Sequence, residues 1–314
     1  MKCIDLFAGV GGIRLGFENA GFKTVFSNDF EPACKETFDL NFDNSPLIIE
    51  DINKINNELI PNFDVLLAGF PCQPFSVAGY RKGFDDPKGR GNLFFRIVEI
   101  IELKKPKVVF LENVKNLRTH DNGKTFKVIK ETLESLGYVV KSKIINTMLH
   151  GNLPQNRERI LIVGFLNKKV AENFIFPEEI KLTKTIKDLL EHKVDEKYYY
   201  EGKPLYDKLK KDIIKKNTAY QWRRKYVREN KSGVVPTLTA NMGTGGHNVP
   251  IILDDKGIRK LTPKECFIFQ GFPRSYKLPP IADSKLYKQA GNSVSVTVIE
   301  RVAKNIGKAL KNGK

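Results

Sequence analysis

Residues 2–17 read KCIDLFAGVGGIRLGF, and this stretch decides the fold. A short apolar run passes through a turn with glycines at positions 9, 11 and 12 and continues into a helix-like pattern. Glycine lets the backbone approach a ligand closely, and a helix N-terminus offers free N–H groups. The dinucleotide fingerprint G-x-G-x-x-G fails, because Arg14 stands where its third glycine belongs. The turn therefore predicts either a ligand other than NAD or a simple tight turn.

Outward from this turn, apolar runs alternate with helix-like segments as far as about residue 165. The predicted strands cover residues 2–7, 23–28, 47–51, 64–70, 107–113, 139–146 and 159–165. The predicted helices include residues 31–41, 92–104 and 125–136. Runs such as VLLAGF and VVFLEN lack polar alternation, which is typical of strands buried on both faces of a parallel sheet. The pattern predicts an α/β fold with a doubly wound, mostly parallel sheet.

The regular pattern weakens after residue 165. Residues 167–217 are rich in lysine, and residues 220–250 combine basic and aromatic residues with a segment rich in Gly, Thr and Asn. Regular patterns return near residue 259, with a helix-like TPKECFIFQG and a final helix near residues 294–310. We therefore expect a large domain over residues 1–175 and 275–314, and a smaller irregular domain over residues 176–274.

The composition favours a polyanionic partner. The chain has 53 Lys and Arg against 36 Asp and Glu, a net charge of +17. Nucleic acid is the leading candidate. An anionic membrane surface is an alternative, but the chain shows no basic amphipathic segment that would anchor it there. A lysine-rich composition without a specific partner is the other alternative. The four cysteines form no CxxC pair, so no metal site or disulfide framework is expected, as in a reducing cytoplasm. Neither a signal peptide nor a membrane-spanning segment is expected.

Two aspartates end successive predicted strands. Asp29 follows the second strand and Asp51 ends the third. A carboxylate at the end of the second strand can accept hydrogen bonds from ribose hydroxyls. Either aspartate alone fits an ordinary loop, but together they favour an adenosine-containing ligand.

A cysteine follows the fourth predicted strand. Cys72 stands between Pro71 and Pro74, which restrict the backbone on both sides. A thiol at the rim of a sheet is a candidate nucleophile, although a structural role is the usual one for a lone cysteine. The next strand ends in residues 111–114, LENV, and burial at such a strand end favours Glu112 as a proton donor. The QNRER segment then carries two arginines, Arg157 and Arg159, which would point the same way in an extended chain.

These residues, in this order, resemble the cytosine-C5 DNA methyltransferase family. The matching motifs are DLFAGVGG, GFPCQPFS around Cys72, ENV at Glu112, QNRER, and GNSV at residues 291–294. The resemblance covers nearly the whole chain except residues 168–258. It implies a doubly wound S-adenosylmethionine-dependent methyltransferase domain and a target-recognition domain, here residues 176–274.

The resemblance also implies residue roles. Cys72 would be the nucleophile and Glu112 the acid on the base, while Arg157 and Arg159 would hold the base and the catalytic site. The S-adenosylmethionine contacts would be Phe7, Gly9, Val10, Gly11, Asp29, Phe30, Asp51, Ile52, Pro71, Leu93, Asn292 and Ser293. Many family members carry glutamate and tryptophan where this chain has Asp29 and Phe30, which keep a carboxylate and an aromatic face.

The implied reaction transfers a methyl group to C5 of a cytosine flipped out of duplex DNA, through a Cys72–C6 adduct and without a metal. The loop over residues 76–92 is expected to close over DNA. The candidate DNA contacts are Ser76, Arg81, Arg223, Arg224, Arg228, Thr237 and Thr239. The family context suggests a bacterial enzyme with a partner restriction endonuclease for the same site, and a lone methyltransferase is the alternative. A monomer is expected, because one base is flipped per event.

Three alternatives remain open at this stage. Some family relatives methylate tRNA with the same motifs, but a variable region as long as residues 168–258 favours duplex DNA. A catalytically silent DNA-binding homologue is disfavoured by the intact Cys72, Glu112 and Arg159. An amino-methyltransferase would carry a D/N/S-P-P-Y/F motif, and AGFPCQPF stands there instead.

Overall fold

The computed structural model describes residues 1–71, 93–244 and 249–313. The chain forms two compact units. Unit 1 comprises Met1–Ile145, Glu158–Pro177 and Ile299–Lys314, and unit 2 comprises Asn146–Arg157 and Glu178–Val298. The division expected from the sequence differs from this one at residues 146–157 and 275–298, which cluster with unit 2.

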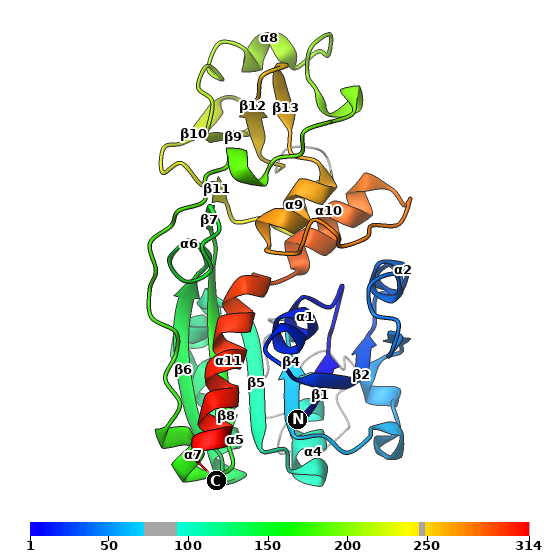
Figure 1. Cartoon of the computed structure of the whole chain (residues 1–314), viewed down its shortest axis with the longest axis vertical. Coiled ribbons are helices and arrows are strands. Elements are labelled where there is room, and N and C mark those ends of the chain that lie inside the picture. Colours follow the sequence, from blue (N-terminus) through cyan, green and yellow to red (C-terminus); the bar gives the residue numbers. More distant parts are fainter. Residues whose placement is uncertain (72–92, 245–248, 314) are drawn as a thin grey trace. The chain divides into compact units, whose positions relative to one another are not determined.

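The described residues of unit 1 form a seven-stranded sheet in the order β3-β2-β1-β4-β5-β8-β6 (Figure 1). The strands are β1 Lys2–Leu6, β2 Lys23–Asp29, β3 Ile48–Ile49, β4 Val65–Ala68, β5 Val108–Val114, β6 Val139–Asn146 and β8 Glu158–Phe165. Strands β1 to β5 pair in parallel, and β8 runs antiparallel to β5. The prediction of an α/β fold with a mostly parallel sheet is therefore confirmed.

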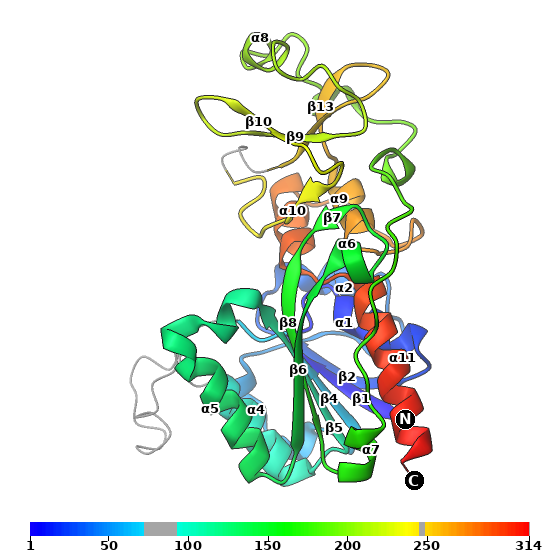
Figure 2. The same ribbon diagram turned by 90° about the vertical axis from the view of Figure 1, so that its left-hand side faces the viewer.

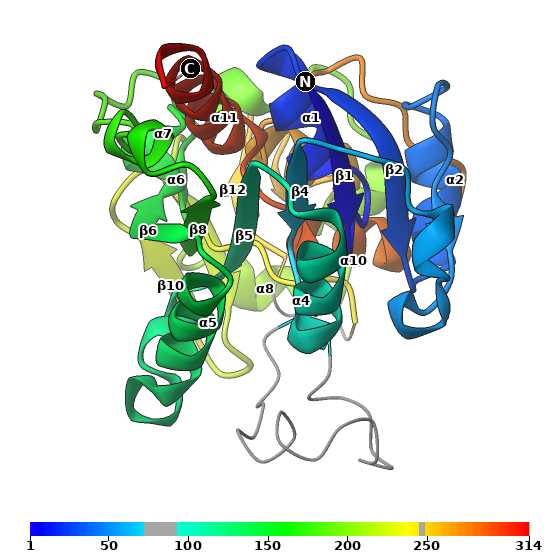
Figure 3. The same cartoon turned by 90° about the horizontal axis from the view of Figure 1, so that it is seen from below.

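Helices cover both faces of this sheet. Figures 2 and 3 show α4 and α5 on one face, and α1 and the part of α11 that belongs to unit 1 on the other. The helices of unit 1 are α1 Gly12–Asn19, α2 Ala33–Asp39, α4 Leu93–Lys104, α5 Lys124–Ser135, α7 Lys168–Glu172 and, from residue 299 on, α11 Val296–Asn312. No helix within the described ranges is long and apolar enough to cross a membrane.

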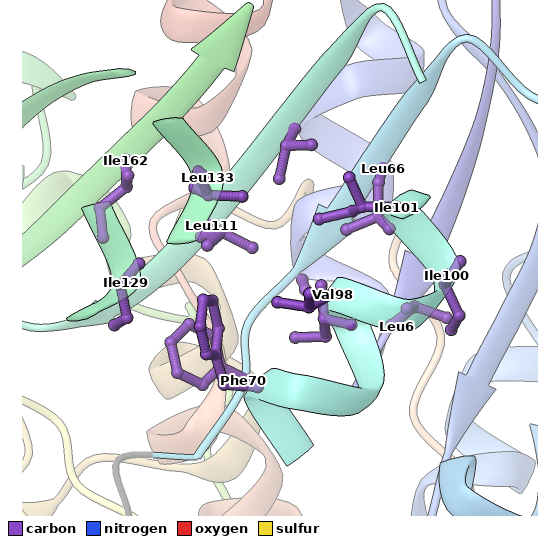
Figure 4. Packing of buried hydrophobic residues seen from close by; sticks show 14 of the residues in the cluster. Leu6, Leu66, Phe70, Val98, Ile100, Ile101, Leu111, Ile129, Leu133 and Ile162 are labelled. Carbon is purple, nitrogen blue, oxygen red and sulfur yellow. The ribbon is translucent and has the colours of Figure 1, made fainter. Parts of the chain in front are cut away.

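The core between the sheet and α4 and α5 explains the uniformly apolar strands. All four residues of β4, and the first six of β5, are buried. Leu66 and Leu111 pack with Ile100 and Ile101 of α4 and Leu133 of α5 (Figure 4). A strand covered by helices on both faces has no solvent side, and its sequence therefore shows no alternation.

Unit 2 contains a four-stranded sheet of order β10-β9-β12-β13 and a two-stranded parallel pair, β11-β7, among its described residues (Figure 1). The strands are β7 Gln155–Asn156, β9 Ala219–Trp222, β10 Val227–Asn230, β11 Val235–Pro236, β12 Ile251–Leu253 and β13 Ile258–Lys260. Its helices are α6 Thr147–His150, α8 Tyr206–Leu209, α9 Pro263–Phe269 and α10 Asp283–Asn292. Helix α9 begins at a capping box between Thr262 and Glu265, which satisfies two backbone donors at its start.

Candidate active site

The carboxyl ends of β1, β2, β4 and β5 meet at one edge of the unit 1 sheet, because these strands are parallel. This edge is where ligands bind in open α/β sheets. The glycine-rich turn follows β1, and Asp29 ends β2. The segment that leads to Pro71 follows β4, and Glu112 lies near the end of β5. Residues from four separate stretches of sequence therefore share one edge.

The turn after β1 depends on unusual backbone angles. Phe7, Gly9 and Gly11 have positive φ values of 58°, 55° and 74°. A Cβ on Gly11 would collide with the ring of Phe42, so only glycine fits there. A Cβ on Gly9, in contrast, would meet nothing within 4 Å. Open space beside Gly9 leaves room for a ligand against the backbone, whereas Val10 is buried and holds the turn to the core.

Asp29 ties the turn to the end of β2. One carboxylate oxygen accepts a hydrogen bond from the Gly9 N–H at 2.7 Å, and the other accepts one from the Glu31 N–H at 2.7 Å. Burial raises the pKa of Asp29, and these backbone bonds partly offset that effect. A carboxylate has about four acceptor positions, so each oxygen keeps capacity for a further donor such as a ribose hydroxyl.

The neighbouring residues also fit an adenosine. Phe30 is 72% exposed, which is unusual for an aromatic ring and leaves its face available for a planar base. Asp51 begins the short helix η1 (Ile52–Lys54), where one of its oxygens accepts from the backbone and side chain of Asn53. Ile52 is buried directly after it. Open space, an exposed ring and a carboxylate with spare acceptors therefore suit the adenosine part of S-adenosylmethionine.

The remaining predicted cofactor contacts are divided between the units. Pro71 is exposed at the end of the segment after β4, and Leu93 is half-buried at the start of α4, both in unit 1. Asn292 and Ser293 lie at the end of α10 in unit 2, so their contact with the cofactor stays a prediction.

We expect Asp29→Asn to weaken S-adenosylmethionine binding roughly tenfold to a hundredfold, because a side-chain amide replaces one acceptor of a charged carboxylate with a donor. Titration calorimetry with the cofactor alone would measure this. Asp64→Asn is the matched control: Asp64 also accepts a backbone N–H, from Lys2, but it precedes β4 at the opposite edge. Equal affinities of the two variants would contradict this role of Asp29.

Glu112 and Arg159 form the most distinctive pair at this edge. In the antiparallel β5–β8 pairing Val114 lies opposite Arg159, so Glu112, two residues before Val114, shares a face with Arg159. The Arg159 Nε lies 3.0 Å from the Glu112 Oε1, with side chains 20% and 11% exposed. The guanidinium supplies a counter-charge for the carboxylate, and both groups still reach solvent. They can hydrogen-bond a planar ligand with adjacent donors and acceptors.

The neighbouring Asn113 holds the chain that leads to the predicted nucleophile. Its side-chain amide donates to the Phe70 carbonyl at 2.9 Å, and its amide oxygen accepts from the Val114 N–H at 2.8 Å. Asn113 is buried, so the segment after β4 is fixed to β5 close to Glu112. The predicted nucleophile Cys72 and the predicted DNA contacts Ser76 and Arg81 lie outside the described residues.

Arg157 has an environment that its sequence motif does not reveal. It is 1% exposed, and its guanidinium donates to the carbonyls of Leu238, Gly291 and Ser293, all within unit 2. Arg159, only two residues later, pairs with Glu112 in unit 1. The sequence had suggested that the two arginines point the same way along an extended segment. In the structure they bind different partners.

The predicted DNA contacts in unit 2 gather on two segments. Arg223 and Arg224 form the exposed turn between β9 and β10, where Arg224 has a positive φ of 64°, and Arg228 is exposed on β10. Thr237 donates to the Asn156 carbonyl at 2.7 Å, and Thr239 bonds the side chain of Asn241 at 2.5 Å. These five residues stay candidate contacts.

Sequence reasoning missed several residues. Gln155 and Gln270 are fully buried and bonded to each other, and Asp5 is fully buried in β1. Gln155 stands in the QNRER motif and Asn113 in ENV. A polar residue inside a motif next to an apolar run could therefore have indicated these two buried positions. Gln270 had no such signal, because its partners lie far away in sequence.

Comparison with known proteins agrees with this geometry. A family model described as C-5 cytosine-specific DNA methylase matches residues 1–308. The chain belongs to this family and is a DNA (cytosine-5) methyltransferase. It is 58% identical to the Type II methyltransferase M.Bsp6I of Bacillus sp. (strain RFL6) over 99% of both chains. It is also 40% identical to M.HhaI of Haemophilus parahaemolyticus, covering 99% of this chain and 95% of that one.

Solved structures show the same fold. The Entamoeba histolytica methyltransferase EhMeth superposes with a TM-score of 0.76 at 22% identity, over 99% of this chain and 98% of that one. The expectation of a methyltransferase α/β fold is therefore confirmed.

Proposed function

We propose that the enzyme transfers the methyl group of S-adenosylmethionine to C5 of a flipped-out cytosine within a specific duplex DNA sequence, through a covalent bond from Cys72 to C6. The observation that supports this most is the Glu112–Arg159 pair at the sheet edge, beside the segment that Asn113 fixes and that leads into Cys72. The pair offers an acceptor and donors beside each other, as the N3 and O2 side of a cytosine requires.

Each residue has a distinct role in this reaction. The Cys72 thiolate adds to C6, which breaks the ring's aromaticity and makes C5 enamine-like. Glu112 hydrogen-bonds or protonates N3, and Arg159 donates to O2, so that both stabilise the negative charge that the addition moves into the ring. S-adenosylmethionine supplies an electrophilic methyl group. Loss of the C5 proton to a base then expels Cys72 and restores the ring.

Unit 2 is proposed to select the sequence. Its exposed turn at Arg223 and Arg224 presents cations on a short hairpin, a form suited to phosphates or guanine edges. The target base must leave the duplex, at a cost of a few kcal/mol. The contacts of unit 2 are expected to repay this cost only at the correct sequence.

The biological setting is also a proposal. M.Bsp6I and M.HhaI are named Type II methyltransferases. By this likeness the enzyme would protect host DNA from a restriction endonuclease that acts on the same site.

Labelled S-adenosylmethionine, mixed-sequence duplex DNA and an RNA control would test the function. We expect label in 5-methylcytosine from DNA, and its loss to background in Cys72→Ser, because an alcohol is a far weaker nucleophile than a thiolate at neutral pH. Cys34→Ser, which changes a cysteine of α2 outside the proposed site, is the matched control and should label DNA normally.

Other outcomes have clear meanings. Label only in RNA would move the substrate to RNA and keep the mechanism. No label with DNA still bound would indicate a silent DNA-binding homologue and would contradict the proposal. Mapping the labelled positions would give the recognition sequence.

A further inference from the structure

Three long polar side chains lie inside unit 2 and connect its segments. Gln155, Arg157 and Gln270 are at most 1% exposed. The Gln155 amide donates to the Phe269 carbonyl at 2.9 Å and to the Gln270 Oε1 at 3.1 Å. Buried polar groups with several partners of this kind hold their segments in one arrangement, because any shift would leave a buried donor or acceptor unpaired.

On one side the network holds the segment 235–239, which carries the candidate DNA contacts Thr237 and Thr239. The Leu238 N–H donates to the Gln155 Oε1 at 3.2 Å, and the Leu238 carbonyl accepts from the Arg157 Nη1 at 2.6 Å. The backbone N–H and the backbone carbonyl of Leu238 are thus both bound by buried side chains. The β7–β11 pairing fixes the register of the preceding residues.

On the other side the network holds the end of α10, which carries the candidate cofactor contacts Asn292 and Ser293. The Arg157 Nη2 donates to the carbonyls of Gly291 and Ser293, and the Gln270 amide donates to those of Ala290 and Ser293. The last carbonyls of a helix lack intrahelical partners and carry partial negative charge. A buried cation is therefore well placed at this helix end.

The two segments also touch through their backbones. A Cβ built on Gly291 would overlap the carbonyl of Thr239 and the N of Ala240, so only glycine permits this approach. The guanidinium of Arg157 lies at the same junction, with one carbonyl from the 237–239 segment and two from the 291–293 segment.

We propose that Arg157 is a positioning residue that couples DNA binding to cofactor binding, by holding the 237–239 segment and the 291–293 segment in one fixed relation. The inference rests on the proposed function and on the contacts that the family resemblance implies, which are DNA for Thr237 and Thr239 and S-adenosylmethionine for Asn292 and Ser293. Because the two segments keep one relation, DNA that favours one position of the first segment also favours the matching position of the second, so the cofactor binds more tightly when DNA is present, and the reverse.

Lysine cannot replace Arg157 in this role. The planar guanidinium directs several N–H groups at carbonyls on two segments, whereas an ammonium is a compact charge on a flexible stem. Arg157→Lys keeps the charge at the end of α10 and loses the simultaneous contacts. Arg274→Lys is the matched control, because Arg274 also donates to two carbonyls of unit 2, those of Asp188 and Leu190, but on the surface.

The test is the ratio of S-adenosylhomocysteine dissociation constants measured without and with a duplex that carries the mapped recognition site. We expect a ratio of roughly 5 to 150 for the wild-type enzyme and for Arg274→Lys. For Arg157→Lys we expect a ratio within about twofold of one. Circular dichroism and thermal unfolding establish that the variants are folded.

If Arg157→Lys does not fold, Gln155→Met takes its place, since it removes one of the two bonds to Leu238 and should lower the ratio by several-fold. A folded variant with the wild-type ratio would overturn the proposal. A variant that methylates more slowly but keeps the wild-type ratio would also overturn it, because Arg157 would then act on the base. A ratio of one for the wild-type enzyme would overturn it as well. Failure of the proposed function would appear separately, as absence of label in 5-methylcytosine.

Discussion

Glu112→Gln is expected to lower the rate of DNA methylation by about 10²- to 10⁴-fold, the range for loss of a positioned acid–base group. The amide has nearly the same shape as the carboxyl group, so packing in β5 should be retained. It cannot deliver a proton to N3, and it no longer attracts the Arg159 guanidinium that lies 3.0 Å away. The addition of Cys72 to C6 then moves charge into a ring that has lost its main stabilising contact.

Single-turnover labelling of the mapped DNA duplex would measure this rate, with calorimetry of S-adenosylmethionine binding beside it. The cofactor affinity should stay within about twofold of wild type, because the cofactor contacts are proposed on other strands. Glu158→Gln is the matched control: Glu158 is also a glutamate paired with a cation, Lys115, but on the surface of β8. A methylation rate of Glu112→Gln equal to that of Glu158→Gln would exclude Glu112 from the chemistry.

Asp5→Asn is expected to stabilise the protein by about 3–5 kcal/mol at pH 8, with little effect at pH 4. Asp5 is fully buried in β1, opposite Ser27 of β2. Neither its carboxylate oxygens nor the Ser27 hydroxyl has a hydrogen-bond partner of normal geometry among the described residues. Burial raises the pKa of Asp5 to about 8, and the charge and backbone N–H of Arg14 only partly oppose this.

The pH dependence follows from the raised pKa. In the unfolded chain the carboxyl group ionises near its ordinary pKa of 3.8, whereas in the folded protein it keeps its proton up to about pH 8. The contribution of Asp5 to the free energy of unfolding is therefore fully present below pH 3.8, and it is lost progressively as the pH rises to 8. Asparagine carries no charge to bury, so the difference in the free energy of unfolding between variant and wild type should grow over this interval.

Urea unfolding at several pH values from about 4 to about 8.5 would measure this difference. Asp64→Asn is the control of opposite sign. Burial alone would raise the pKa of Asp64, but hydrogen bonds from Lys107 and the Lys2 N–H outweigh this and lower it. The stabilisation by the ionised Asp64 is present above its ordinary pKa. Asp64→Asn should therefore be less stable than the wild type by the same amount at neutral and at alkaline pH. A constant difference for Asp5→Asn across this range would contradict a protonated Asp5.

Much of the fold and of the candidate site could be predicted from the sequence because these features depend on local patterns. Strands such as β5 and helices such as α4 were predicted to within about two residues, since continuous burial or helical spacing marks them directly. The positions of Asp29 and Glu112 at strand ends followed from the same patterns. The order of the motifs sufficed to indicate the family and the reaction.

The partners of the buried polar residues depended on tertiary structure. The antiparallel direction of β8, which brings Arg159 to Glu112, depends on how distant segments pair and not on the sequence of β8. Arg157 and Arg159 look equivalent in QNRER, yet one is enclosed by carbonyls from residues 81 to 136 positions away and the other joins an ion pair. Local sequence sets which backbone conformation each residue prefers and which face of a helix or strand its side chain occupies. Which groups surround a buried charge is set by long-range packing, because desolvation and hydrogen bonding depend on every element that closes around it.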